Sequence, residues 1–209
     1  MATDAEVQEK FYNEIQSVCG RRPLEFKDVS DLIFGLCIMY ETMRLFPVLG
    51  TLPRRPEQDE LLLRKLWIPK GASIGPDLVS LHRNERYWGP TCNEFNPSRF
   101  DNRYTDSQGW HPIMDGKLKI PAKGAFIPFG EGPRNCLGSF KLLPKADLNI
   151  GRRFAEIEFV TCLALVVQKW HIRLAEGWTK AQVWNILDAS VQYATIRPSS
   201  NIPIVLEKR

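Results

Sequence analysis

Apolar residues recur at every third or fourth position in two segments near the start of the chain. This spacing predicts amphipathic helices, because positions three and four apart share one helix face. The first helix is expected over residues 5–18, with an apolar face of Val7, Phe11, Ile15 and Val18. The second is expected from Asp28, as the N-cap, to Phe46, with Pro47 ending it. Its inward stripe is predicted to be Val29, Leu32, Ile33, Leu36, Tyr40 and Met43.

Farther along, shorter apolar pieces alternate with charges, prolines and glycines. The stretch "LLLRKLWIPKGASIG" predicts a hairpin with its turn at residues 69–71, and residues 76–89 predict a short helix. Residues 152–168 are apolar on almost every face, so that helix is expected to be buried on several sides. The tail contains strand-like pieces. These patterns together predict a mainly α fold with small β-sheets, in a single domain over residues 1–209.

Composition narrows the functional classes. The chain of 209 residues has a formal charge of +4 without a long run of Lys or Arg, which argues against a nucleic-acid partner. The longest apolar runs are shorter than the ~18 residues of a bilayer span, and "MATDAEVQEK" has no signal-peptide pattern. The five cysteines include no CxxC pair, which argues against a zinc site or a disulfide framework and favours a reducing compartment.

One cysteine stands out by its surroundings. Cys136 lies in "FGEGPRNCLG", although a free cysteine is most often simply a small buried hydrophobic residue. Gly130, Gly132 and Gly138 allow the backbone to turn and a flat ligand to approach closely. Arg134 can complement an acidic ligand group and favour the thiolate. On these residues alone, a cofactor site and a buried thiol are equal alternatives.

The spacing of this stretch decides between them. Phe129, Gly132, Arg134, Cys136 and Gly138 match F-x-x-G-x-R-x-C-x-G, and in this the chain resembles the cytochrome P-450 family. The resemblance implies that the loop binds haem with Cys136 as the iron ligand. It further implies that Phe129 packs near the haem, that Arg134 binds a propionate and that the two glycines shape the loop. A thiolate ligand donates electron density to the iron.

Two further motifs agree with the resemblance. Glu41 and Arg44 form an E-x-x-R pair on the second predicted helix, and Arg99 lies in "FNPSRF", which resembles the P-x-R-F element of the family. Taken alone, such an i,i+3 pair is more often a solvated surface pair. The resemblance implies instead a buried structural network of Glu41, Arg44 and Arg99. It also aligns Arg54 with a basic residue that contacts a propionate.

The family resemblance implies a function for the longer protein to which such a segment corresponds. It implies the C-terminal, proximal-haem portion of a haem-thiolate monooxygenase, which inserts oxygen into a small apolar substrate with electrons from a reductase. The alternative is a truncated, non-catalytic haem-binding fragment. Full-length relatives are expected on the endoplasmic reticulum membrane, whereas this chain, without an anchor, is expected in the cytoplasm.

Residues 139–151 depart from the family pattern. Relatives continue directly from C-x-G into a helix with a basic residue and F-A-x-x-E, whereas here "SFKLLPKADLNIG" comes before "RRFAEIE". Pro144 within this stretch is expected to interrupt the helix that follows the cysteine. The insert is interpreted as a misassigned exon boundary or retained short intron, with a genuine surface loop as the alternative.

Overall fold

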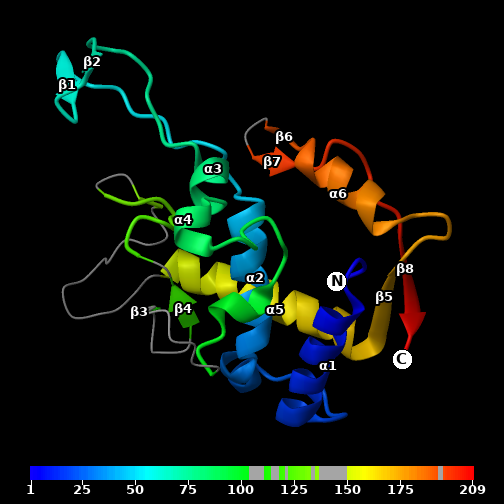
Figure 1. Ribbon diagram of the computed structural model, residues 1–209. Helices are drawn as coiled ribbons and strands as arrows, with labels where there is room; N and C mark the ends of the chain where they lie inside the picture. Colours follow the sequence, from blue (N-terminus) through cyan, green and yellow to red (C-terminus); the bar gives the residue numbers. More distant parts are fainter. Residues whose placement is uncertain (104–110, 114–117, 121, 133–134, 137–149, 193–194) are drawn as a thin grey trace.

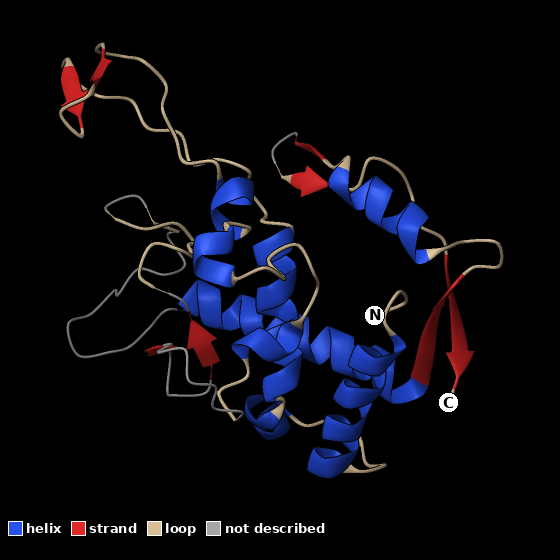
Figure 2. Ribbon diagram, viewed as in Figure 1, coloured by secondary structure: helices blue, strands red, loops and turns tan. Residues whose placement is uncertain are grey.

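Three long helices form the centre of the molecule (Figure 1). They are α1 (Ala5–Cys19), α2 (Ile33–Leu45) and α5 (Ile150–Lys169). The computed structural model describes residues 1–103, 111–113, 118–120, 122–132, 135–136, 150–192 and 195–209. In these residues the strands form small antiparallel pairs at the periphery (Figure 2). The arrangement is therefore mainly α with small sheets, as the sequence predicts.

The three helices share one hydrophobic core. Asp4 caps α1 by accepting the Val7 amide at 3.1 Å, and Gly20 ends this helix with φ 60°. The predicted apolar face of α1 is the face that packs inward, with Phe11 and Ile15 fully buried. The core members that α2 and α5 contribute include Phe34, Cys37, Ile38, Val160, Ala164 and Val167.

The helix predicted over residues 28–46 is divided, and the expectation that Asp28 begins it is wrong. Asp28 lies inside η1 (Phe26–Asp31), where its carboxylate accepts the Glu25 amide at 2.8 Å. The same carboxylate pairs with Arg22 at 2.6 Å. Leu32 then leaves the helical conformation with φ −82° and ψ 63°, so α2 begins only at Ile33.

The start of α2 is capped from another helix. The Glu14 carboxylate of α1 accepts the amides of Phe34 at 2.9 Å and Gly35 at 3.3 Å, which satisfies donors that a helix N-terminus leaves open. Burial raises the pKa of Glu14, against the opposing effect of these hydrogen bonds. The single inward stripe predicted for α2 is also wrong, because Phe34, Cys37 and Ile38 outside that stripe are buried as well.

The hairpin has a different turn from the predicted one. Strands β1 (Glu60–Leu62) and β2 (Leu66–Ile68) pair antiparallel, and the chain reverses at residues 63–65. Leu63 and Arg64 take left-handed φ angles of 52° and 56° there, which side chains other than glycine and asparagine seldom adopt. Residues 69–72 form a second turn at the exit of β2, with the Ala72 amide bonded to the Pro69 carbonyl at 3.1 Å.

Short elements then cross the end of α2. The single helix predicted over residues 76–89 is two helices, α3 (Leu78–His82) and α4 (Glu85–Trp88), because Asn84 caps a new start. A 3-10 helix, η2 (Pro97–Phe100), packs directly on α2. Strands β3 (His111–Ile113) and β4 (Leu118–Ile120) pair beyond it.

The tail contains a helix that the strand-like pattern did not predict. Strand β5 (Trp170–Leu174) pairs with β8 (Ile204–Lys208), and β6 (Val191–Gln192) with β7 (Ile196–Arg197). Between β5 and β6 along the chain lies α6 (Lys180–Asp188), which begins with a Thr179–Gln182 capping box. The prediction that α5 is buried on several sides holds for only part of its surface, since Phe154 is 63% exposed and Leu165 43%. Among the described helices, none is both long and apolar enough to cross a bilayer.

Helix α1 packs closely on α2 at Gly35. A Cβ at this position would lie 2.6 Å from the Phe11 ring and 3.2 Å from Val160 Cγ1. We expect Gly35→Ala to lower the free energy of unfolding by about 1–3 kcal/mol, because overpacking outweighs the better helix propensity of alanine. Urea unfolding measures the change. In a Phe11→Leu background the cost of Gly35→Ala should shrink, and an additive double mutant would contradict the proposed contact.

Candidate functional site

Glu41 and Arg44 lie on one face of α2, one helical turn apart. Both side chains are 0% exposed, and they form a two-pronged pair with Nε to Oε2 at 2.7 Å and Nη2 to Oε1 at 2.9 Å. A buried ion pair offsets its loss of hydration only when the remaining polar atoms also find partners. The neighbours of this pair therefore decide whether it can be tolerated.

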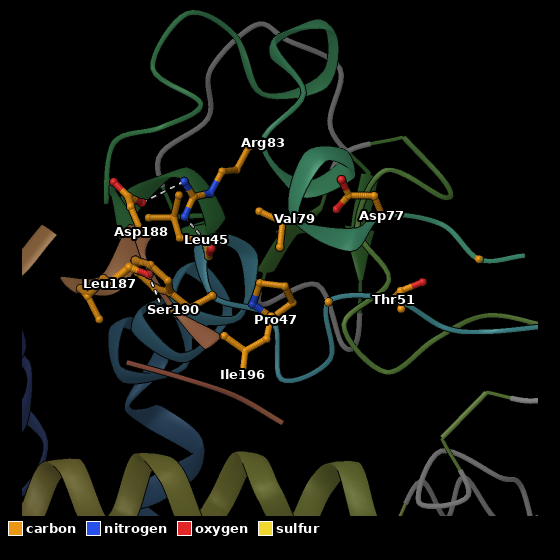
Figure 3. A pocket seen from close by; sticks show the side chains of 13 residues that line it. Leu45, Pro47, Thr51, Asp77, Val79, Arg83, Leu187, Asp188, Ser190 and Ile196 are labelled. Carbon is orange, nitrogen blue, oxygen red and sulfur yellow. Dashed lines mark hydrogen bonds and ion pairs between the residues drawn. The ribbon is translucent and has the colours of Figure 1, made fainter. Parts of the chain in front are cut away.

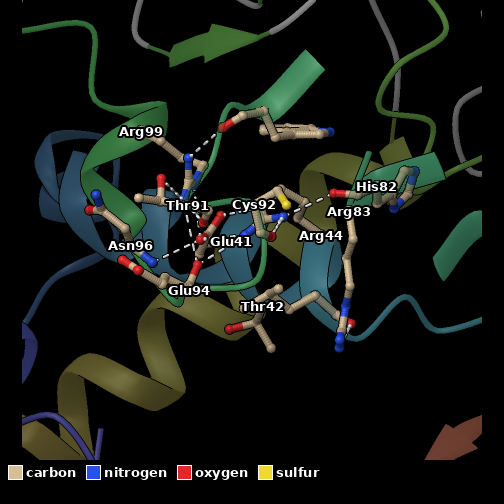
Figure 4. Close-up of polar contacts among 12 residues, drawn as sticks. Glu41, Thr42, Arg44, His82, Arg83, Thr91, Cys92, Glu94, Asn96 and Arg99 are labelled. Atoms are coloured by element: carbon tan, nitrogen blue, oxygen red, sulfur yellow. Dashed lines mark hydrogen bonds and ion pairs between the residues drawn. The ribbon is translucent and has the colours of Figure 1, made fainter. Parts of the chain in front are cut away.

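Arg44 uses all of its N–H groups. Nη1 donates to the carbonyls of His82 at 2.9 Å and Cys92 at 2.6 Å, and Nη2 also donates to Glu94 at 3.1 Å (Figure 4). With the bonds to Glu41, these account for the five donors of a guanidinium. The segment that connects α3 to η2 is thereby wrapped around the end of α2.

Arg99 of η2 completes the cluster. Its Nε donates to Glu41 Oε1 at 3.1 Å, and its Nη2 donates to the Thr91 carbonyl at 2.9 Å. The Asn96 amide donates to the same Oε1 at 2.8 Å. The Arg99 side chain is only 8% exposed. The structure therefore brings Glu41, Arg44 and Arg99 together into one buried cluster, which we call the ion cluster.

Backbone hydrogen bonds join the described residues 127–132 to one another and to Cys136. The Gly130 amide donates to the Ile127 carbonyl at 2.9 Å, and the Cys136 amide donates back to the Phe129 carbonyl at 2.8 Å. Gly130 and Gly132 have φ of 73° and 84°, in the left-handed region that suits glycine. Cys136 is exposed, whereas Cys37 is buried.

Three further predicted site residues are Arg134, Gly138 and Arg54. Arg134, Gly138 and most of the insert, residues 139–149, lie outside the described residues. Arg54 forms an isolated antiparallel bridge with Ile74, and its Nη1 donates to the Pro53 carbonyl at 3.1 Å. In the described part of the chain, no hydrogen bond or ion pair joins Arg54 to Cys136.

A second buried polar group supports the loop, and the sequence analysis did not identify it. The Tyr40 hydroxyl donates to Glu156 at 2.6 Å, and Arg152 binds both the Tyr40 oxygen and Glu156, the latter at 3.0 Å. Burial raises the pKa of Tyr40, with Arg152 opposing. The Arg152 guanidinium also lies 5.2 Å from the centre of the Phe129 ring. The i,i+4 spacing of Arg152 and Glu156 was the available sequence signal.

A cavity of about 370 Å³ opens beside the segment after α2 (Figure 3). The Ile196 amide donates to the Val48 carbonyl at 2.9 Å, which joins the tail to that segment. Arg83 donates to the Leu45 carbonyl at 2.9 Å and pairs with Asp188 at 3.3 Å across the cavity. The residues that line the cavity include Pro47, Thr51, Val79, Leu187, Ser190 and Ile196.

The ion cluster gives a direct stability prediction. Glu41→Gln keeps the shape of the side chain but leaves two buried guanidinium groups without their carboxylate. We expect the free energy of unfolding to fall by about 3–5 kcal/mol, measured by urea unfolding. Glu207→Gln is the matched control, since Glu207 pairs with Arg173 at 2.9 Å on the surface. That control should cost less than about 1 kcal/mol, and an equal cost for both variants would contradict the prediction.

Comparisons with known proteins show the family to which the chain belongs. The family model described as cytochrome P-450 matches residues 1–142. A cytokinin hydroxylase from Arabidopsis thaliana is 31% identical over 201 residues, which cover 96% of this chain and 32% of that protein. A probable cytochrome P-450 508A4 from Dictyostelium discoideum is 28% identical over 214 residues, or 100% of this chain and 38% of that protein.

A solved structure supports the same fold. The haem domain of a cytochrome P-450DA mutant matches with a TM-score of 0.70 and 24% identity, over 98% of this chain and 37% of that chain. This likeness confirms the predicted fold class. The chain spans about a third of the length of the curated relatives it matches. Because the family model matches more than half of its residues, the chain belongs to the cytochrome P-450 family.

Proposed function

We propose that this chain supplies the thiolate-ligand portion of a haem-thiolate monooxygenase, with Cys136 as the ligand of the haem iron. The observation that supports this proposal is the exposed Cys136 in a loop whose backbone is closed by the bond from its amide to the Phe129 carbonyl. A thiolate is a suitable donor for haem iron, and a fixed backbone orients it. The residues present therefore fit the group.

The remaining loop residues would hold the cofactor. Phe129 would pack near the macrocycle, Gly132 and Gly138 would keep the backbone close to it, and Arg134 and Arg54 would each bind a propionate. When bound, thiolate-ligated haem would supply dioxygen activation, in which one oxygen atom enters an organic substrate and two electrons from the reductase with two protons reduce the other to water. The role of the protein would be to donate the thiolate, to orient it and to neutralise the propionates.

The ion cluster would act as a brace in this function. Glu41, Arg44 and Arg99 are buried and bound to the segment between α3 and η2. His82 of α3 in turn accepts the amide of Ile127, the first residue of the segment 127–136, which we call the thiolate loop. Because all three side chains are buried, none of them is accessible to a ligand, and their role would be structural. A small apolar substrate is proposed to lie next to the segment after α2, with electrons delivered by a reductase.

A second candidate function is a haem-binding fragment without turnover. It is favoured by the share of relatives that the chain matches, 32% of the cytokinin hydroxylase and 38% of the Dictyostelium protein. Turnover assays with a reductase and dioxygen separate the two functions. Substrate oxidation that depends on Cys136 supports the monooxygenase, whereas thiolate-ligated haem without oxidation supports the fragment.

The proposed iron ligand is tested by the reduced, carbon-monoxide difference spectrum of the haem-reconstituted chain. We expect a red-shifted, thiolate-type Soret band that Cys136→Ala abolishes, because the alanine side chain cannot ligate iron. Cys162→Ala is the matched control, since Cys162 is also free and exposed. A version without residues 139–151 shows whether the insert weakens haem binding. A band that survives Cys136→Ala, or that Cys162→Ala removes, would contradict the assignment.

A further inference from the structure

His82 ends α3 at a fully buried position between the ion cluster and the thiolate loop. Its side chain is 0% exposed. Its ring centre lies 5.0 Å from that of Phe126, which also packs on the rings of Tyr40 at 5.7 Å and Phe100 at 5.3 Å. A histidine in such an aromatic cluster could serve only as packing, so its hydrogen bonds decide whether it does more.

Both polar ends of His82 bind partners that matter for the site. Its carbonyl accepts Arg44 Nη1 at 2.9 Å, which ties its backbone to the ion cluster. Its ring Nε2 accepts the amide of Ile127 at 3.0 Å, which ties its side chain to the first residue of the thiolate loop. The Ile127 carbonyl then accepts the Gly130 amide at 2.9 Å. A continuous series of bonds therefore runs from the ion cluster into the loop that carries Cys136.

This bond requires one form of the imidazole. An acceptor at Nε2 means that the ring is neutral with its proton on Nδ1. Burial lowers the pKa of His82 to about 4, with the nearby Met43 carbonyl opposing and the Arg44 charge adding to the decrease. Nδ1 makes no hydrogen bond of normal geometry among the described residues. The Ile127 amide is thus the partner that defines the tautomer.

We propose that His82 is a positioning residue that holds the start of the thiolate loop through its bond to the Ile127 amide. Without this acceptor, the Ile127 amide would be left unsatisfied beside an aromatic cluster, and the bonds from Gly130 to Ile127 and from Cys136 to Phe129 would lose their fixed starting point. The inference deepens the proposed function, on which its relevance to iron ligation rests. The hydrogen bond itself can be tested without haem.

Two substitutions separate positioning from packing. His82→Phe keeps an aromatic ring against Phe126 but has no acceptor, whereas His82→Gln can place an oxygen near the position of Nε2. In native-state amide exchange, we expect His82→Phe to accelerate exchange at Ile127 by about tenfold or more relative to the amides of α1. His82→Gln should restore protection to within about threefold of the wild-type chain.

Isotope-edited NMR of the unsubstituted chain tests the same bond without any variant. A long-range ¹H–¹⁵N spectrum should show His82 Nε2 unprotonated and Nδ1 protonated. The opposite tautomer would overturn the proposal, even if both variants failed to fold. So would an Ile127 amide that exchanges equally in His82→Phe and wild type, or variants in which all amides accelerate together.

The haem-loaded chain distinguishes failure of this inference from failure of the proposed function. His82→Phe should reduce the fraction of haem that gives the thiolate-type band, and His82→Gln should retain it. If the exchange results hold but wild type and both variants lack the band, the positioning role stands and iron ligation by Cys136 fails. If the band is equal in all three while Ile127 exchange is unchanged, the positioning role fails alone.

Discussion

The fold around the candidate site depends on one buried carboxylate. Glu41 Oε1 accepts from Arg44, Arg99 and the Asn96 amide, while Oε2 accepts from Arg44. Because two guanidinium groups share a single carboxylate in a dry interior, their remaining donors need carbonyl partners. Those carbonyls come from the segment between α3 and η2, which cannot satisfy them unless it wraps around the end of α2. The path of a long irregular segment is thus fixed by hydrogen-bond requirements rather than by regular structure.

A second constraint comes from the aromatic cluster next to these charges. Phe126 packs against Tyr40, Trp88 and Phe100, and it immediately precedes Ile127, where the thiolate loop begins. On the other side, Arg152 reaches from α5 to Tyr40, Glu156 and the ring of Phe129. The thiolate loop is therefore held at Ile127 by a hydrogen bond and at the Phe129 ring by the Arg152 guanidinium, while Cys136 is exposed. This arrangement suits the proposed role of Cys136 as an iron ligand, which requires a fixed orientation and one accessible side.

The sequence predicted those features whose signal is local or whose spacing is a family motif. The apolar face of α1 follows from the spacing of residues close together in the chain, whereas the buried cluster of Glu41, Arg44 and Arg99 was implied by the family resemblance. The Tyr40–Glu156 bond follows from neither, because its partners are 116 residues apart and no pattern in the sequence links one to the other. The hairpin turn was misplaced because Leu63 and Arg64 adopt left-handed angles without a glycine or asparagine to indicate them. The α6 helix was missed although the Thr179–Gln182 capping box was visible.

The ion cluster is proposed to fix the loop that contains Cys136. Native-state hydrogen exchange at the Cys136 amide, in wild type and in Glu41→Gln, tests this claim most directly. The amide of Ile172 is the internal reference, since it bonds to Gln8 Oε1 at 2.6 Å outside the ion cluster. We predict that Glu41→Gln accelerates hydrogen exchange of the Cys136 amide more than that of the Ile172 amide. Equal acceleration of the two amides, or an unchanged Cys136 amide, would contradict it.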